Sequence, residues 1–249
     1  MTHADPMYVA CAVLAVTISG LGKGGFAGLG ALSMPIMAQG VGAVEGAAIL
    51  LPILVVQDAV GVWAFRRTWD RTILKSMLPG MALGVALGYA LAAVVNEVVV
   101  TGVVGFLSMA FGLYRLWLER GGKIPVSSSL PDWVGVLFGV AAGFTSQIAH
   151  AGAPPFQMWV IPRRLPRDIL VGTTAIAFAA MNWMKVPAYA ALGQFTRDNL
   201  QSSALLLPVA LAATAAGVAL VRKINAQRFY TVIYVLMVLL GLKLFVQAF

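Results

Sequence analysis

Six long apolar segments constrain this chain more than any other feature of its sequence. Each is 21 to 24 residues long, enough for a helix that crosses a hydrocarbon core of about 30 Å. Only 10% of the 249 residues are charged, against about one quarter in an average soluble domain. We therefore expect an all-α polytopic membrane protein. The segments are 43–65, 72–95, 98–118, 168–191, 200–221 and 228–248.

Two further apolar segments are too long for one straight crossing. Met7–Gln39 has 33 residues and Asp132–Ile161 has 30, so a single helix of either would be about 45 to 50 Å long. Both carry small residues in the middle, in SGLGKGGFAGLGALSM (19–34) and AGFTSQIAHAGAPPF (142–156). Two arms of about 14 residues, each about 20 Å long, would enter the membrane and leave on the same side. We expect a re-entrant helical hairpin in 7–39 and another in 132–161.

The hairpins are part of a weak internal repeat. Downstream of them, WDRTIL (69–74) resembles FTRDNL (195–200), and FGLYRLW (111–117) resembles LGLKLFV (240–246). The sequence therefore predicts an N-terminal repeat, 1–121, and a C-terminal repeat, 122–249. Each contains one hairpin and three transmembrane helices. Because three crossings is an odd number, the second repeat is expected to be inverted relative to the first.

The positions of the basic residues favour hairpins over single crossings. With hairpins, thirteen of the 17 lysines and arginines fall on one face, as the positive-inside rule requires of the cytoplasmic face. With single crossings, the same clusters divide seven against six. Both termini are then expected outside. The clusters are Arg66, Arg67, Arg71, Lys75; Arg115, Arg120, Lys123; Arg163, Arg164, Arg167; and Arg222, Lys223, Arg228.

Several function classes find little support. Gly20, Gly22 and Gly25 satisfy G-x-G-x-x-G, but a dinucleotide site needs a preceding strand in a soluble unit. Two histidines, one cysteine and no clustered carboxylates leave little for metal or nucleophilic chemistry. We expect no enzyme, catalytic residue, metal or cofactor. The net charge of +8 is assigned to membrane orientation rather than to nucleic acid.

Inverted repeats with broken helices are the pattern of secondary transporters, whose sites lie near the midplane where the halves meet. The two hairpin tips should approach each other there. New half-helices near Gly30 and Gly152 would present backbone N–H groups and positive dipole ends, which attract anions. The candidate substrate contacts are Lys23, Gly24, Gly25, Gly30, Thr145, Ser146, Gln147, His150, Gly152, Asn182 and Lys185.

The ionisable candidates leave alternatives open. Lys23 is either an anion contact or a cation that balances the C-terminal end of the first arm. His150 either serves the substrate or a coupled proton, or is a neutral imidazole bonded inside the tip. Asp58 either pairs with Lys23, carries a coupled proton, or faces a cytoplasmic vestibule. Lys185, on one helix face with Asn182, either lines the site or snorkels to the outer surface.

Small residues four apart predict two flat helix faces. Gly80, Gly84 and Gly88 form one series, and Gly135, Gly139 and Gly143 form the other. Membrane helices use such faces for close packing. We assign these glycines to packing rather than to the site.

A family resemblance rests on three elements of the doubled arrangement. They are GLGKGGFAGLGALSMP (20–35), GFTSQIAHAGAPP (143–155), and Asn182 with Lys185 and the downstream Gly193. Together they resemble the TauE/SafE family over nearly the whole chain. Gln147 and His150 stand where glycines are more typical of that family.

The resemblance implies a multi-pass protein of the bacterial inner membrane that exports small sulfur-containing anions such as sulfite, sulfoacetate or a similar sulfonate. The expected partners are a small anion and the lipid bilayer, with a coupling proton as a candidate carried by Asp58 or His150. A homodimer is compatible with the sequence. The alternative is an anion or small-solute channel that uses the same hairpins as a filter.

Overall fold

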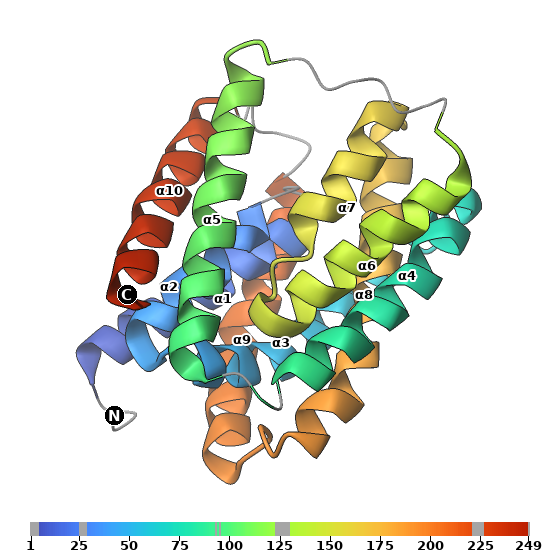
Figure 1. Cartoon of the computed structure of the whole chain (residues 1–249). Coiled ribbons are helices and arrows are strands. Elements are labelled where there is room, and N and C mark those ends of the chain that lie inside the picture. Colours follow the sequence, from blue (N-terminus) through green and yellow to red (C-terminus); the bar gives the residue numbers. More distant parts are fainter. Residues whose placement is uncertain are drawn as a thin grey trace.

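A computed structural model of the chain describes residues 5–24, 29–92, 94, 96–122, 130–220 and 227–248. Every regular element in these residues is helical, as Figure 1 shows. The elements are α1 (Pro6–Lys23), η1 (Leu29–Leu32), α2 (Ser33–Val41), α3 (Ala43–Phe65), α4 (Arg71–Ala92), α5 (Glu97–Glu119), α6 (Asp132–Ala149), α7 (Ala153–Val160), η3 (Ile161–Arg163), α8 (Arg167–Ala191), α9 (Arg197–Leu220) and α10 (Gln227–Ala248).

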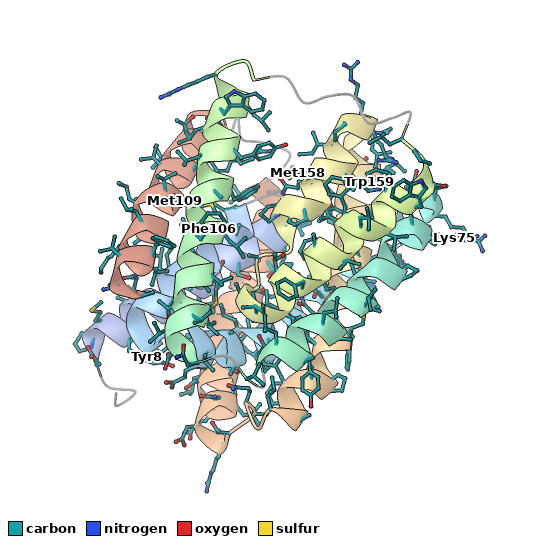
Figure 2. The ribbon with its side chains drawn as sticks, in the orientation of Figure 1. Tyr8, Lys75, Phe106, Met109, Met158 and Trp159 are labelled. Carbon is teal, nitrogen blue, oxygen red and sulfur yellow. The ribbon has the colours of Figure 1, made fainter. Side chains whose placement is uncertain are left out.

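Six of the described helices are long and apolar enough to cross a membrane. Five of them, α3, α4, α5, α8 and α9, coincide with segments that the sequence predicts. The sixth is α1, and the remaining predicted segment is α10, whose apolar part is Tyr234–Ala248. Large apolar side chains such as Phe106 and Met158 (Figure 2) are about half exposed. The chain is a polytopic membrane protein, as its composition predicts.

Both over-long segments contain two helices, but the prediction of equal arms is wrong. α1 has 18 residues and α2 has nine, while α6 has 18 and α7 has eight. At about 1.5 Å per residue, each long arm reaches about 27 Å, most of a hydrocarbon core. Within each pair the short helix packs against the long one. The second break lies where it was expected, because α7 follows directly on Gly152.

The first break also lies where it was expected, since α1 ends at Lys23 and η1 starts at Leu29, but the glycines near the end of α1 serve packing. A Cβ added at Gly20 would lie 2.7 Å from Ala213 Cβ, and one at Gly24 would lie 2.5 Å from Gly217. Both partners belong to α9, which packs along α1. These glycines therefore bring α1 and α9 together, and the helix ends at Lys23. The predicted tip residue Gly25 lies outside the described residues.

The two glycine series pack against each other, as their spacing predicts. α4 and α6 lie side by side in Figure 1 and form the most extensive helix pair. A Cβ at Gly84 would lie 2.1 Å from the Val140 carbonyl oxygen, and one at Gly143 would lie 2.2 Å from the Met81 carbonyl oxygen. Only glycine permits so close an approach of two backbones. The long arm of the second hairpin is thereby fixed to the first half of the chain.

α3 and α8 occupy the middle of the molecule. α3 contacts α8 and α9, and α8 contacts α3 and α4, while α5 and α10 pair at one side (Figure 1). The starts of α4 and α9 carry the same kind of cap. The Ile73 N–H donates to Asp70 Oδ1, and the Asn199 N–H donates to Thr196 Oγ1. The WDRTIL and FTRDNL motifs therefore have the same structural role, since each caps the start of a membrane helix.

The α4–α6 contact predicts a sensitive position. We expect Gly84→Ala to lower the free energy of unfolding by about 1 to 3 kcal/mol, because the added methyl group overlaps the Val140 carbonyl. Thermal unfolding in detergent measures the change. Ala82→Val, on the exposed face of the same helix, is the control and should leave the midpoint near the wild-type value. An unchanged midpoint for Gly84→Ala would contradict the close packing.

Candidate functional site

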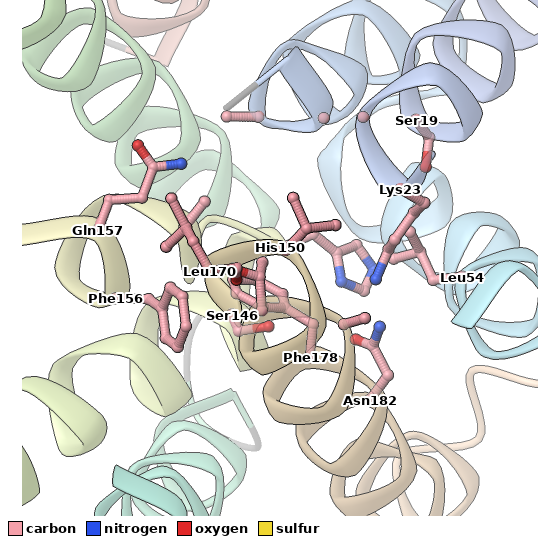
Figure 3. A pocket seen from close by; sticks show the side chains of 17 residues that line it. Ser19, Lys23, Leu54, Ser146, His150, Phe156, Gln157, Leu170, Phe178 and Asn182 are labelled. Atoms are coloured by element: carbon pink, nitrogen blue, oxygen red, sulfur yellow. The ribbon is translucent and has the colours of Figure 1, made fainter. Parts of the chain in front are cut away.

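A cavity of about 110 Å³ lies where the two helix breaks meet. We call it the tip cavity, and Figure 3 shows the side chains that line it. Its walls come from both hairpins and both central helices, namely α1, η1, α3, α6, α7 and α8. Because one water needs about 10 to 15 Å³, the cavity accommodates a solute of several atoms. The polar lining side chains are Ser19, Lys23, Ser146, His150, Gln157, Thr174 and Asn182.

One wall of the tip cavity is held by the Asp58 carboxylate. Asp58 is 2% exposed and lies on α3, where it forms an ion pair with Lys23 at the end of α1. Its second oxygen accepts a hydrogen bond from Asn182 Nδ2 on α8, at 2.7 Å. The Lys23 side chain keeps 16% exposure, and its ammonium lies 5.4 Å from the centre of the Phe178 ring. Asp58 therefore pairs with Lys23 while Lys23 and Asn182 still face the cavity.

A second buried cation lies next to this group. Lys185 is completely buried on α8, which excludes the alternative that it snorkels to the surface. Its ammonium lies 3.2 Å from the Ser146 carbonyl oxygen, 3.1 Å from Ser146 Oγ and 2.5 Å from His150 Nδ1. Three acceptors match the three N–H donors of an ammonium group. Lys185 thus ties α8 to the tip of the second hairpin.

The second tip is shaped by His150. This residue ends α6 in the left-handed conformation, with φ at 50°, which is uncommon outside glycine. Its Nε2 lies 2.9 Å from the Ala47 carbonyl oxygen on α3. A carbonyl only accepts, so Nε2 carries the proton and Nδ1 is free to accept from Lys185. His150 is therefore bonded inside the tip and also lines the tip cavity, so the two alternatives for it are compatible.

The structure gathers only part of the predicted site. Lys23, Gly30, Ser146, His150 and Asn182 line the tip cavity. Four other described candidates, Gly24, Thr145, Gly152 and Lys185, do not, and Gln147 lines a separate cavity.

The candidates outside the tip cavity have other contacts. Gly24 packs against α9. Thr145 Oγ1 lies 2.8 Å from the Ala141 carbonyl oxygen and 2.9 Å from that of Ala151, so it satisfies the backbone of its own hairpin. Gly152 is in close contact with α6, because a Cβ there would lie 2.8 Å from the Ala142 carbonyl oxygen.

One face of α8 lines the tip cavity, as its spacing predicts. Thr174, Phe178 and Asn182 line the cavity one turn apart. Lys185 lies on the same face but contacts Ser146 instead of the cavity. The two tips supply donors in different ways. Among the described residues no atom lies within 4 Å of the Cβ position of Gly30, so these residues leave its backbone uncovered on that side. Pro154 and Pro155 have no N–H, so the second tip relies more on its side chains.

Sequence reasoning missed three features. Ser19 lies one helical turn before Lys23 and lines the same cavity, so the spacing of four residues could have identified it. Its Oγ donates to Gln57 Oε1 at 2.8 Å. Gln157, in α7, lines the opposite wall, and its Oε1 accepts a hydrogen bond from Arg115 Nη1 at 3.5 Å. The pairing of Lys185 with His150 has no sequence signal, because it depends on where the second tip meets α8.

The resulting chemistry is that of a small cationic site. Asp58 neutralises Lys23, whereas Lys185 contacts only uncharged acceptors among the described residues. Hydroxyl and amide donors face the cavity beside apolar groups such as Leu54 and Phe156. An oxyanion with a short apolar part matches both kinds of surface.

Comparison with known families gives one match. A family model described as "Sulfite exporter TauE/SafE" matches residues 8–244, nearly the whole chain. The comparisons with curated proteins and with solved structures found no match.

The Lys23–Asp58 pair leads to a test of stability. Removing one partner leaves a buried charge, so Lys23→Met and Asp58→Leu should each lower the unfolding free energy by about 3 kcal/mol. The double variant should recover most of this loss, because it leaves neither charge alone. Unfolding midpoints in detergent measure the cycle, with the exposed Lys75→Met (Figure 2) as control. Additive losses in the double variant would contradict the pairing.

Proposed function

This chain belongs to the sulfite exporter TauE/SafE family, and we propose that it is a secondary transporter that exports small sulfur-containing anions by alternating access. The substrate is sulfite, sulfoacetate or a similar sulfonate. The observation that carries the proposal is the tip cavity, where both helix breaks meet the partly exposed Lys23 near the middle of the bundle. Transporters bind substrates at such meeting points of broken helices.

We further propose that 1–121 and 122–249 are inverted repeats, each with a re-entrant hairpin and three transmembrane helices. Support comes from the packing partners. If α1 to α5 are exchanged for α6 to α10 in order, the α1–α9 contact becomes α6–α4 and the α3–α9 contact becomes α8–α4. The α3–α8 and α5–α10 pairs map onto themselves. A two-fold axis between the repeats requires this pattern.

We place the protein in the bacterial inner membrane with both termini outside. The start of α1 and the end of α10 lie near the same edge of the molecule (Figure 1). The basic clusters follow the other ends of the helices, as the positive-inside rule expects of the cytoplasmic face. A coupling proton, a homodimer and the absence of enzymatic activity stay predictions from the sequence.

In the proposed site, Lys23 and Asn182 contact the anion without leaving Asp58. An ammonium has three N–H donors and an amide nitrogen has two, and Asp58 occupies one of each. Ser146 and the backbone at Gly30 complete the donor set. Lys185 holds His150 in place from behind. Asp58 and His150 are the candidate proton carriers. Asp58 contacts the first hairpin through Lys23, and His150 ends α6 at the second tip.

The binding role of Asn182 can be tested directly. We expect Asn182→Ala to weaken sulfite and sulfoacetate binding about three- to tenfold, the effect of losing one hydrogen bond. Isothermal titration with purified protein measures the affinity. Asn199→Ala is the matched control, because Asn199 is also a buried amide but bonds to Gln194 away from the cavity. Unchanged affinity for Asn182→Ala would move the site elsewhere.

Transport kinetics separate the transporter from a channel. Uptake of ³⁵S-labelled sulfite and sulfoacetate into proteoliposomes should saturate, and a gradient of the coupling ion should drive it uphill. Non-saturable flux that only runs downhill would support a channel through the same hairpins. Lack of flux for every sulfur anion offered, in a folded preparation, would refute the substrate class.

A further inference from the structure

A second cavity, of about 310 Å³, lies beyond the tip cavity. Its walls come from the start of α3, the end of α4, the start of α5 and the ends of α6 and α8. It therefore faces the end of the molecule opposite the basic clusters of the α3–α4 turn. Leu91 and Val99 at its rim are 40% and 44% exposed.

The second cavity contains an unused polar group. Gln147 lines it and is only 2% exposed. Neither its amide nitrogen nor its amide oxygen has a hydrogen-bond partner in the part of the chain that the structure describes. Gly88 makes room for this side chain, because a Cβ there would lie 2.8 Å from Gln147 Cβ. A buried amide without partners costs free energy, so this arrangement indicates that a solute or water uses it.

Only one layer of side chains separates the two cavities. His150 lines the tip cavity, and its bonded partner Ala47 lines the second cavity. Tyr189, which lines the second cavity, stacks on the His150 ring at 6.0 Å. The neighbours Ser146 and Gln147 face one cavity each.

Two helices line both cavities. On α8, Leu170 to Asn182 line the tip cavity, and Tyr189 lines the second. On α3, Leu54 lines the tip cavity, and Ala47 and Val44 line the second. The two cavities therefore follow each other along the same two helices.

We propose that the second cavity is an outer binding station of the same path, in which the Gln147 amide receives the oxyanion after it passes the His150–Tyr189 barrier. This inference rests on the proposed transport function. The Gln147 nitrogen offers two N–H donors to anion oxygens, and Tyr189 holds the neighbouring backbone by donating its hydroxyl to the Gln147 carbonyl at 3.0 Å. The barrier opens toward this cavity when it closes toward the tip cavity.

The charge at the opening of the second cavity favours release of an anion over its binding. Glu97 is exposed, lines the second cavity, and lies against Gly42. It is the only charged residue among the described residues that line this cavity. Its carboxylate repels an anion, so the outer station binds more weakly than the tip cavity with Lys23. Glu97→Gln should therefore raise the outward-side affinity for sulfoacetate about threefold.

Thiol labelling tests the two openings without any substrate. Cys11 is the only cysteine, so Val103→Cys (second cavity) and Val171→Cys (tip cavity) are made in a Cys11→Ala background. A membrane-impermeant thiol reagent should modify position 103 only from the face that carries the termini, and position 171 only from the opposite face. Lipid-facing Leu83→Cys should react from neither. Reaction of both cavity positions from one face, or no reaction at 103 from either, would overturn the proposal.

Kinetics test the amide itself. Gln147→Leu should lower the sulfoacetate transport rate about tenfold and change equilibrium binding at the tip cavity less than twofold, while Gln147→Asn should keep more of the rate. Gln39→Leu is the matched control, since the Gln39 amide nitrogen is also buried and without a partner in the described residues but lines neither cavity. A wild-type rate for Gln147→Leu would overturn the outer station.

The labelling and transport experiments separate this inference from the proposed function. If wild-type protein binds and transports no sulfur anion, the substrate proposal fails, yet the labelling pattern still decides whether the second cavity opens to the other face. If wild-type protein transports sulfoacetate but both cavity positions label from one face, only the outer station fails.

Discussion

The Asp58 carboxylate connects the first hairpin to α8. The proposed transport requires these two parts to move together. A buried carboxylate must be paired, because an isolated charge in a low-dielectric interior is very costly. Asp58 meets this need with a cation from the first hairpin and an amide from α8, which belong to different halves of the chain. The pairing therefore fixes the position of Lys23 at the cavity wall and limits how far the first tip can move from α8 without a replacement partner.

Close glycine packing fixes the rest of the framework. The long arm of each hairpin is held against a helix of the other half, α1 against α9 and α6 against α4, by contacts that a Cβ would block. Where lipid is as apolar as the side chains, helices associate through packing and polar contacts rather than hydrophobic burial. The long arms are thus anchored, while the short arms pack into the apolar cores, where Met37 and Trp159 are completely buried. Lys23 and His150 at the tips are held by polar contacts instead.

Composition and periodicity predicted much of this fold because bilayer thickness and small-residue spacing act locally along the chain. The helix spans, the two broken segments, the α4 and α6 glycine faces and the face of α8 through Asn182 all follow from such rules. The sequence could not predict which glycines turn and which pack, because Gly20 and Gly24 are defined by their contact with α9. It also could not show that Gln147 and Ser146, adjacent in sequence, face different cavities. Those facts depend on tertiary contacts between distant segments.

The two cations of the site differ in a way that bears on anion selectivity. Lys23 is neutralised by a carboxylate and partly exposed, so it can contact an anion while it keeps its pair. Lys185 has no exposure and is surrounded by a carbonyl, a hydroxyl and an imidazole. Its donors are therefore used by groups of the barrier, so Lys185 holds His150 and the second tip in place and does not contact the anion. In the proposed cycle, Lys185 positions the barrier between the two cavities, whereas Lys23 and Asn182 decide which anion is retained at the tip. Because the His150 side chain both bonds to Lys185 and forms part of the barrier, a shift of the second tip by one side-chain width changes the accessible cavity.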